Sequence, residues 1–171
     1  VNVSIIGTAP DVGFTATTAC LGTPTVFTDL SDAAPGDEIV SWVWDFGNDN
    51  TSTENNPEFL FAEPGTYGVT LTTTAASTCS KSITSEVLVL PVPQAQFSTD
   101  LACISVPYQF TNLSETPEGE SITSWSWSFG DGGTDTAPDP EYVFDDPGVY
   151  DVNLNVVASN GCEDSLSVSI E

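Results

Sequence analysis

The sequence repeats itself with a period of 83 residues, and this repeat limits the folds open to the chain. The matched pairs are Cys20 and Cys103, Trp42 and Trp125, Trp44 and Trp127, Tyr67 and Tyr150, and Cys79 and Cys162. The spacing is the same for every pair, so no insertion separates the copies. We therefore expect two copies of one module, at residues 9–91 and 92–171.

Residues 1–8 align at the same spacing with residues 84–91, the end of a copy. Val1, Val3 and Ile5 alternate with Asn2 and Ser4, which is the pattern of a half-buried strand. We expect residues 1–8 to be the last strand of a preceding copy, or else an N-terminal extension.

Each copy shows period-2 alternation and Gly, Pro, Asn and Asp turns, which predict strands and no helix. The predicted strands lie around Phe14 and Phe97, at 26–28 and 108–110, at 41–47 and 124–130, near 51–53 and 58–62 and their counterparts, from Tyr67 and Tyr150 onward, and at 82–90 and 165–170. About seven short strands per copy, with Trp on the third strand, predict an immunoglobulin-like β-sandwich. Tyr67 and Tyr150 open the sixth strand, the position of a tyrosine corner.

Charge excludes several functions. The chain has 25 acidic residues, one basic residue (Lys81) and no histidine, for a net charge of −24. One lysine cannot neutralise a phosphate backbone, so no nucleic-acid partner is expected. Catalytic triads and metal sites that need histidine are excluded. No apolar run is long enough to span a bilayer, so no membrane insertion is expected.

The acidic side chains give no sign of catalysis. They are scattered over predicted turns and strand edges, whereas a glycosidase needs two carboxylates at a fixed separation across a cleft. Asp135-Thr136-Ala137 loosely resembles an aspartic-protease loop, but the aligned Ser52-Thr53-Glu54 lacks the key aspartate. We expect that the chain is not an enzyme.

The third strand and the segments after it resemble the PKD (polycystic kidney disease) repeat. The two copies contain Trp44-Asp45-Phe46-Gly47 and Trp127-Ser128-Phe129-Gly130, then Asn56-Pro57 and Asp139-Pro140, then Gly65-Thr66-Tyr67 and Gly148-Val149-Tyr150. The resemblance covers nearly the whole chain. It implies two tandem immunoglobulin-like PKD domains whose core signature is Trp44, Phe46, Tyr67, Trp127, Phe129 and Tyr150.

The cysteine-bearing form, with its Gly161–Ser165 turn, resembles the repeats of Bacteroidetes surface proteins of the adhesin and gliding-motility type. That resemblance implies a non-catalytic stalk or spacer at the cell surface. Its partners would be neighbouring repeats of the same polypeptide, surface polysaccharide or other surface proteins. The alternative is an accessory module of a secreted hydrolase that binds carbohydrate or protein.

Calcium is the one cofactor that the acidic turns suggest, because hard cations prefer several oxygen ligands. Immunoglobulin-like topology would place acids of both copies at the ends that face the next module. The candidate ligands are Asp49, Glu63, Glu115, Glu118, Glu120, Glu163 and Asp164. The other interpretation is that these acids only keep an exported protein soluble.

The four tryptophans, Trp42, Trp44, Trp125 and Trp127, allow two roles. They could form a flat platform that stacks on sugars. Their spacing places each pair on the face shared with Phe46 or Phe129, which favours the core.

The four cysteines suggest disulfides and an extracellular location. Pairing within each copy would join Cys20 to Cys79 and Cys103 to Cys162. In immunoglobulin topology, however, these positions lie at opposite ends of a module, roughly 20 Å or more apart. Pairing across the junction would join Cys20 to Cys162 and leave Cys79 and Cys103 for neighbouring modules. Both pairings remain open from the sequence.

Overall fold

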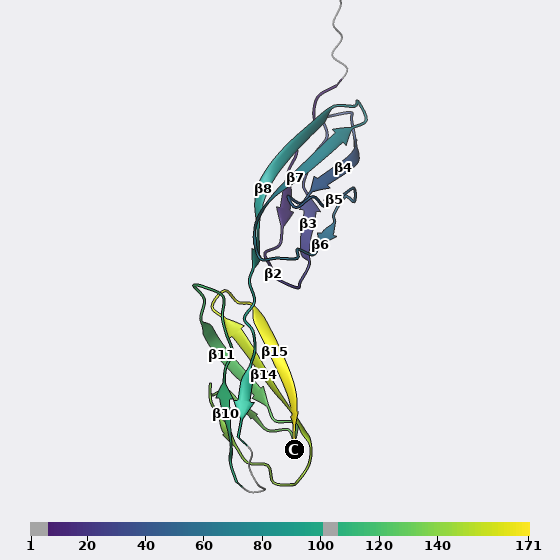
Figure 1. Cartoon of the computed structure of the whole chain (residues 1–171). Coiled ribbons are helices and arrows are strands. Elements are labelled where there is room, and N and C mark those ends of the chain that lie inside the picture. The colour runs from purple at the N-terminus through teal and green to yellow at the C-terminus, as the bar shows by residue number, and fades with distance from the viewer. Residues whose placement is uncertain (1–6, 101–105) are drawn as a thin grey trace, which may run out of the picture. The chain divides into compact units, whose positions relative to one another are not determined.

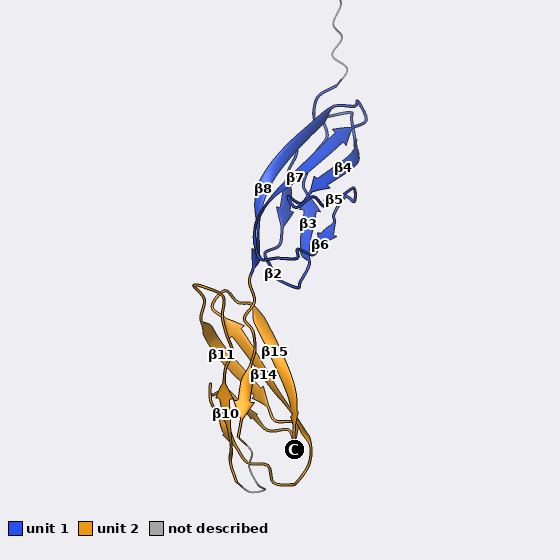
Figure 2. Cartoon of the chain, viewed as in Figure 1, with its two compact units in different colours: residues 1–90 blue, residues 91–171 orange. Residues whose placement is uncertain are grey.

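The computed structural model describes residues 7–100 and 106–171, and these residues form strands and turns with no helix. The chain divides into two compact units, residues 1–90 and 91–171 (Figure 2). The all-β prediction is confirmed. In the part of the chain that the structure describes, no helix could cross a membrane. The strand expected at the N-terminus falls, for residues 1–6, outside the described residues.

Unit 1 is built from two sheets (Figure 1). Its strands are β1 (Phe14–Ala16), β2 (Ala19–Cys20), β3 (Thr25–Asp29), β4 (Ile39–Asp45), β5 (Thr51–Ser52), β6 (Glu58–Phe59), β7 (Gly65–Ala75) and β8 (Ser80–Leu90). The smaller sheet has the order β1-β3-β6, and the larger has the order β2-β8-β7-β4-β5. The predicted strands are all present. β2, which pairs in parallel with the end of β8, was not predicted because two residues show no periodicity.

Unit 2 repeats this plan. Its strands are β9 (Phe97–Thr99), β10 (Tyr108–Asn112), β11 (Ile122–Ser128), β12 (Thr134–Asp135), β13 (Glu141–Tyr142), β14 (Tyr150–Ala158) and β15 (Glu163–Ile170). The sheets have the orders β13-β10-β9 and β12-β11-β14-β15. The register repeats as well: Trp44 lies opposite Leu71, and Trp127 lies opposite Leu154.

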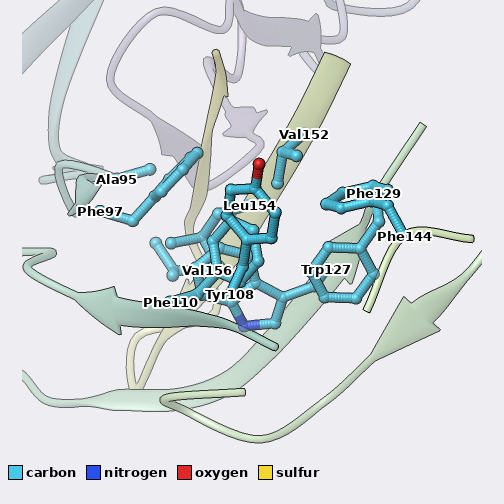
Figure 3. Packing of buried hydrophobic residues seen from close by; sticks show 10 residues of the cluster. All are labelled: Ala95, Phe97, Tyr108, Phe110, Trp127, Phe129, Phe144, Val152, Leu154 and Val156. Atoms are coloured by element: carbon cyan, nitrogen blue, oxygen red, sulfur yellow. The ribbon is translucent and has the colours of Figure 1, made fainter. Parts of the chain in front are cut away.

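The core of each unit lies between its two sheets and is rich in aromatic rings. In unit 2, Trp127 of β11 and Phe129, which directly follows that strand, meet Phe110 of β10 and Phe144 of the loop after β13 (Figure 3). Unit 1 has the matching set with Trp44 at its centre. Trp44 and Trp127 are both 0% exposed. Burial of rings this large is the main stabilising contribution in each small unit.

Candidate functional site

The tryptophans of the third strand belong to the core. Trp44 Nε1 donates to the Glu54 carbonyl at 2.9 Å, and Trp127 Nε1 donates to the Ala137 carbonyl at 2.9 Å. Each buried indole N–H is therefore satisfied inside its own unit. Trp42 and Trp125 are half-buried and pack against the same cores. The tryptophans do not form a flat exposed platform for sugars.

The glycine that follows this strand is needed for two reasons. Gly47 has φ +76° and Gly130 has φ +83°, in the left-handed region that favours glycine. In addition, a Cβ on Gly47 would lie 2.9 Å from the Gly68 carbonyl oxygen, and one on Gly130 would lie 2.9 Å from the Asp151 backbone. The Trp-x-Phe-Gly motif thus ends where two backbones approach too closely for any side chain.

Tyr67 and Tyr150 form tyrosine corners. The Tyr67 hydroxyl donates to the Glu63 carbonyl at 2.8 Å, and the Tyr150 hydroxyl donates to the Asp146 carbonyl at 2.7 Å. Each bond reaches back four residues and holds the Pro-Gly turn against the start of its strand.

The two units differ around the first tryptophan of the motif. In unit 1, Trp42 Nε1 donates to Asp29 Oδ2 at 2.6 Å. The aligned residue of unit 2 is Asn112, and Trp125 Nε1 is buried with no hydrogen-bond partner among the described residues. Sequence reasoning missed this pair, although the aspartate-to-asparagine change between aligned positions was visible.

A second difference lies at the turn after the third strand. In unit 2, the Tyr142 hydroxyl donates to the Asp131 carboxylate, with oxygen–oxygen distances of 2.9 and 2.8 Å. The hydroxyl occupies space that opens because residue 133 is glycine, where a Cβ would overlap it. The aligned residues of unit 1 have no such chemistry: Phe59 replaces the tyrosine and Asn48 the aspartate.

This contact shifts both ionisable groups. A hydrogen bond from the Gly133 backbone, partly offset by desolvation and reinforced by Tyr142, lowers the pKa of Asp131 below its ordinary value. Burial, together with the hydrogen bond and negative charge of Asp131, raises the pKa of Tyr142 to about 12. The contact therefore favours an ionised carboxylate and a neutral phenol.

Unit 2 has a cavity of about 270 Å³ at its Pro-Gly turn. The rings of Tyr108, Phe144 and Tyr150 line it together with Val149, and Asp146 and Glu171 add carboxylates. Val149 is 68% exposed, the highest value among the large apolar side chains of the described residues. The cavity offers an apolar surface with an acidic rim.

The candidate calcium ligands are placed separately. Asp164 accepts a hydrogen bond from the Ala95 N–H at 2.8 Å, and Glu120 accepts one from the Ser159 hydroxyl. Within residues 7–100 and 106–171, no group of three or more acidic or cysteine side chains is arranged to hold a metal ion. The remaining candidates, Asp49, Glu63, Glu115, Glu118 and Glu163, join no such group there. Calcium binding stays a prediction.

The cysteines fall into different states. Cys20 and Cys162 are each disulfide-bonded, and Cys79 has a free thiol. The alternative that joins Cys20 to Cys79 is therefore not formed. The reason is that β8, 11 residues long, separates the two positions by roughly 35 Å. Cys103 lies outside the described residues.

The chain is similar in sequence to parts of two larger bacterial proteins. The chain is 27% identical over 134 residues to the pre-pro-metalloprotease PrtV of Vibrio cholerae, which covers 78% of this chain and 14% of that protein. It is 49% identical over 35 residues to collagenase ColA of Bacillus cereus, covering 20% of this chain and 4% of that protein.

Among solved structures, the PKD1 domain of Vibrio anguillarum Epp is 29% identical with a TM-score of 0.47, covering 50% of this chain and 98% of that chain. The PKD1 domain of PrtV is 34% identical with a TM-score of 0.45, covering 48% and 99%.

The family model described as the PKD domain matches residues 8–90 and again residues 89–171, so each unit corresponds to one match. The chain therefore belongs to the PKD domain family and consists of two tandem PKD domains.

Proposed function

We propose that the chain is a non-catalytic accessory segment of an exported hydrolase that acts on protein, and that it binds the insoluble substrate. One observation carries the proposal: the similarity to a metalloprotease precursor extends over 78% of this chain yet spans only 14% of that protein. The short match to a collagenase supports the same class of substrate.

The chemistry of the chain supports a binding role rather than a catalytic one. Histidine is absent, and the one lysine, Lys81, contacts Asp11 in an exposed ion pair at 3.1 Å. Disulfide-bonded Cys20 and Cys162 support export, because such bonds persist in oxidising compartments. The net charge of −24 suits an exported protein that must stay soluble.

The cavity of unit 2 is the feature best suited to contact a polymer. Its three aromatic rings and Val149 offer apolar surface to a substrate side chain, and the rim carboxylates accept hydrogen bonds from peptide N–H groups. The aligned turn of unit 1 carries Thr66 in place of Val149. We therefore assign binding to unit 2.

A sedimentation assay tests the proposal. The chain is mixed with insoluble collagen, or with cellulose in a parallel arm, and the pelleted fraction is measured. We expect retention on collagen that Val149→Glu reduces at least fivefold. The matched control is Val143→Glu, because Val143 is also exposed in unit 2 but does not line the cavity. Equal loss with both variants would contradict binding at the cavity.

The second candidate is a stalk or spacer of a cell-surface adhesin of the Bacteroidetes gliding-motility type. The direct tandem repeat favours it, since apart from β2 the described sheets of both units share strand order and register, and no insertion separates the copies. A spacer would show no retention in either arm of the assay. Retention on cellulose alone would instead indicate a carbohydrate-binding module.

A further inference from the structure

Cys79 and Cys162 occupy the same hairpin in their two units. In unit 1 the Ala75 N–H donates to the Cys79 carbonyl at 2.9 Å, and in unit 2 the Ala158 N–H donates to the Cys162 carbonyl at 2.8 Å. The turn hydrogen bond inside each hairpin also recurs, since the Thr78 N–H donates to the Ala75 carbonyl at 2.8 Å. The same backbone therefore presents both sulfurs.

The hairpin has the same backbone conformation in both units, although the residue at the turn of unit 1 disfavours it. The residue before each cysteine has a positive φ, +86° at Gly161 but +71° at Thr78. A β-branched residue is strained in that region. The turn of unit 1 thus holds Cys79 in the geometry of Cys162 despite the strain.

The two cysteines differ in bonding. Cys162 is disulfide-bonded and 1% exposed, whereas Cys79 is a free thiol and only partly buried. Cys79 and Cys162 are aligned by the repeat, and Cys162 forms a disulfide. A cysteine at this position of the domain can therefore form a disulfide when a second cysteine lies within reach.

The surroundings of Cys79 indicate where its partner would come from. A Cβ on Gly7 would overlap the Ser77 side chain and lie 3.1 Å from Cys79 Sγ, so the chain entering unit 1 passes directly beside the thiol. Gly7 aligns with Leu90, which ends β8. Leu90 pairs with Cys20 through the short strand β2. A cysteine placed like Cys20 in a domain preceding unit 1 would therefore lie beside Cys79.

We propose that Cys79 is a disulfide half-site for the Cys20-type cysteine of a PKD domain joined to the N-terminal side of unit 1. The two thiols lose two protons and form one S–S bond. The two electrons pass to a disulfide oxidant such as oxidised glutathione, which becomes two thiols. The bond fastens consecutive domains by a covalent link besides the backbone. This inference rests on the proposed function in one respect: export would bring the chain into a compartment that supplies the oxidant.

A tandem chain tests this inference. One copy cut after Leu166 is followed directly by Val1 of a second copy, which keeps the 83-residue register because residue 1 aligns with residue 84. The protein is refolded with reduced and oxidised glutathione and digested at glutamate without reduction. All four cysteines fall in different peptides, since Glu63, Glu86 and Glu115 separate them. The first copy carries Cys79→Ser and the second copy carries Cys103→Ser, because the two copies otherwise release identical cysteine peptides. The second copy's Cys79 should then be joined to the first copy's Cys103.

Two controls make the result decisive. Six Gly and Ser residues inserted at the junction break the register, and that chain should form the bond at least tenfold more slowly. In the single 171-residue chain with Cys103→Ser, folded Cys79 should react with Ellman's reagent. Recovery of the second copy's Cys79 as a free thiol in a tandem chain with native tryptophan fluorescence would overturn the inference, as would an unreactive Cys79 in the single chain. Neither readout depends on substrate retention.

Discussion

At the scale of single residues, the Trp-x-Phe-Gly motif is explained by contacts rather than by chemistry. The tryptophan and phenylalanine fill the core, and the glycine allows a left-handed turn against a neighbouring backbone. The motif that identifies the family is therefore a folding signal, and its residues are unsuitable as probes of binding.

Gly47→Ala and Gly130→Ala should each destabilise the protein by about 2 kcal/mol or more, because a left-handed conformation costs a non-glycine residue about 1–2 kcal/mol and the backbone contact adds to it. Thermal unfolding measures the effect. Gly13→Ala is the control, since a Cβ there would lie 3.8 Å from its nearest neighbours. Equal melting temperatures for all three variants would refute the close-approach argument.

Exchanging the aligned residues Asp29 and Asn112 should change the free energy of unfolding in opposite directions. Asp29→Asn should weaken the hydrogen bond from Trp42 and lower stability by about 1 kcal/mol. Asn112→Asp should raise stability by a similar amount, because it supplies an acceptor to the buried Trp125 N–H. Urea unfolding followed by tryptophan fluorescence checks both. Changes of the same sign would show that the indole N–H is not the deciding group.

At the scale of elements, the contact between Tyr142 of β13 and Asp131 of the turn after β11 distinguishes unit 2 from unit 1. The tyrosine also stacks on Phe129, with ring centroids 3.8 Å apart, as Phe59 stacks on Phe46 at 4.1 Å. The ring contact is common to both units and the hydroxyl contact is added only in unit 2. It fastens the turn to the edge of the smaller sheet.

Tyr142→Phe should keep the stacked ring and lose the hydroxyl contact, at a cost of about 1 kcal/mol after allowance for the exposure of Asp131. Phe59→Tyr in unit 1 is the matched control. It should give no gain, since Asn48 and Asn50 stand where unit 2 has Asp131 and Gly133. Thermal melts of both variants decide, and a gain from Phe59→Tyr would contradict the need for glycine.

The same contact sets a pH dependence. Because the folded pKa of Asp131 is lowered, its contribution is present above the unfolded pKa and is lost as pH falls through the folded pKa. Because the pKa of Tyr142 is raised to about 12, its contribution is present below about pH 10 and is lost as pH rises toward 12. Unfolding from pH 2 to 12 should show both losses in wild type and smaller losses in Tyr142→Phe. Identical profiles would argue against the contact.

At the scale of the whole molecule, the charge is distributed over both domains. Residues 9–91 contain 11 acidic residues and Lys81, and residues 92–171 contain 14 acidic residues. No acidic tail accounts for the net charge. The charge is thus a property of the repeated surface, which limits self-association and requires screening wherever acids face one another.

Calcium binding gives one test at this scale. If the acids of the two domains bind calcium, 1 mM calcium should raise the melting temperature by several degrees relative to excess chelator. Glu115→Gln combined with Glu118→Gln should remove that increase, while magnesium at the same concentration controls for general screening. An unchanged melting temperature would count against a structural calcium site.

The connectivity of the disulfide gives a second test at the scale of the whole molecule. We predict that Cys20 is joined to Cys162 in the native chain. Digestion at glutamate without reduction should yield one mass that contains both cysteine peptides, and this mass should disappear in Cys162→Ser. A native chain with Cys20 joined to Cys103 would refute the prediction.

The sequence by itself was sufficient for the repeat, the all-β class and nearly every strand. These depend on local periodicity and on residue spacing, and both can be read directly from the order of the residues. It also placed Trp44, Trp127 and both tyrosine corners, because alternation assigns side chains to faces.

Only the tertiary structure decided which groups meet. The strand β2, the Tyr142–Asp131 contact, the acceptor of Trp42 and the free state of Cys79 all depend on residues that are distant in sequence. Each is set by packing and hydrogen bonding between elements, and these contacts have no periodicity for a pattern to detect. The two-residue strand β2 and the Tyr142 hydroxyl find their partners only when the elements of their own unit pack together.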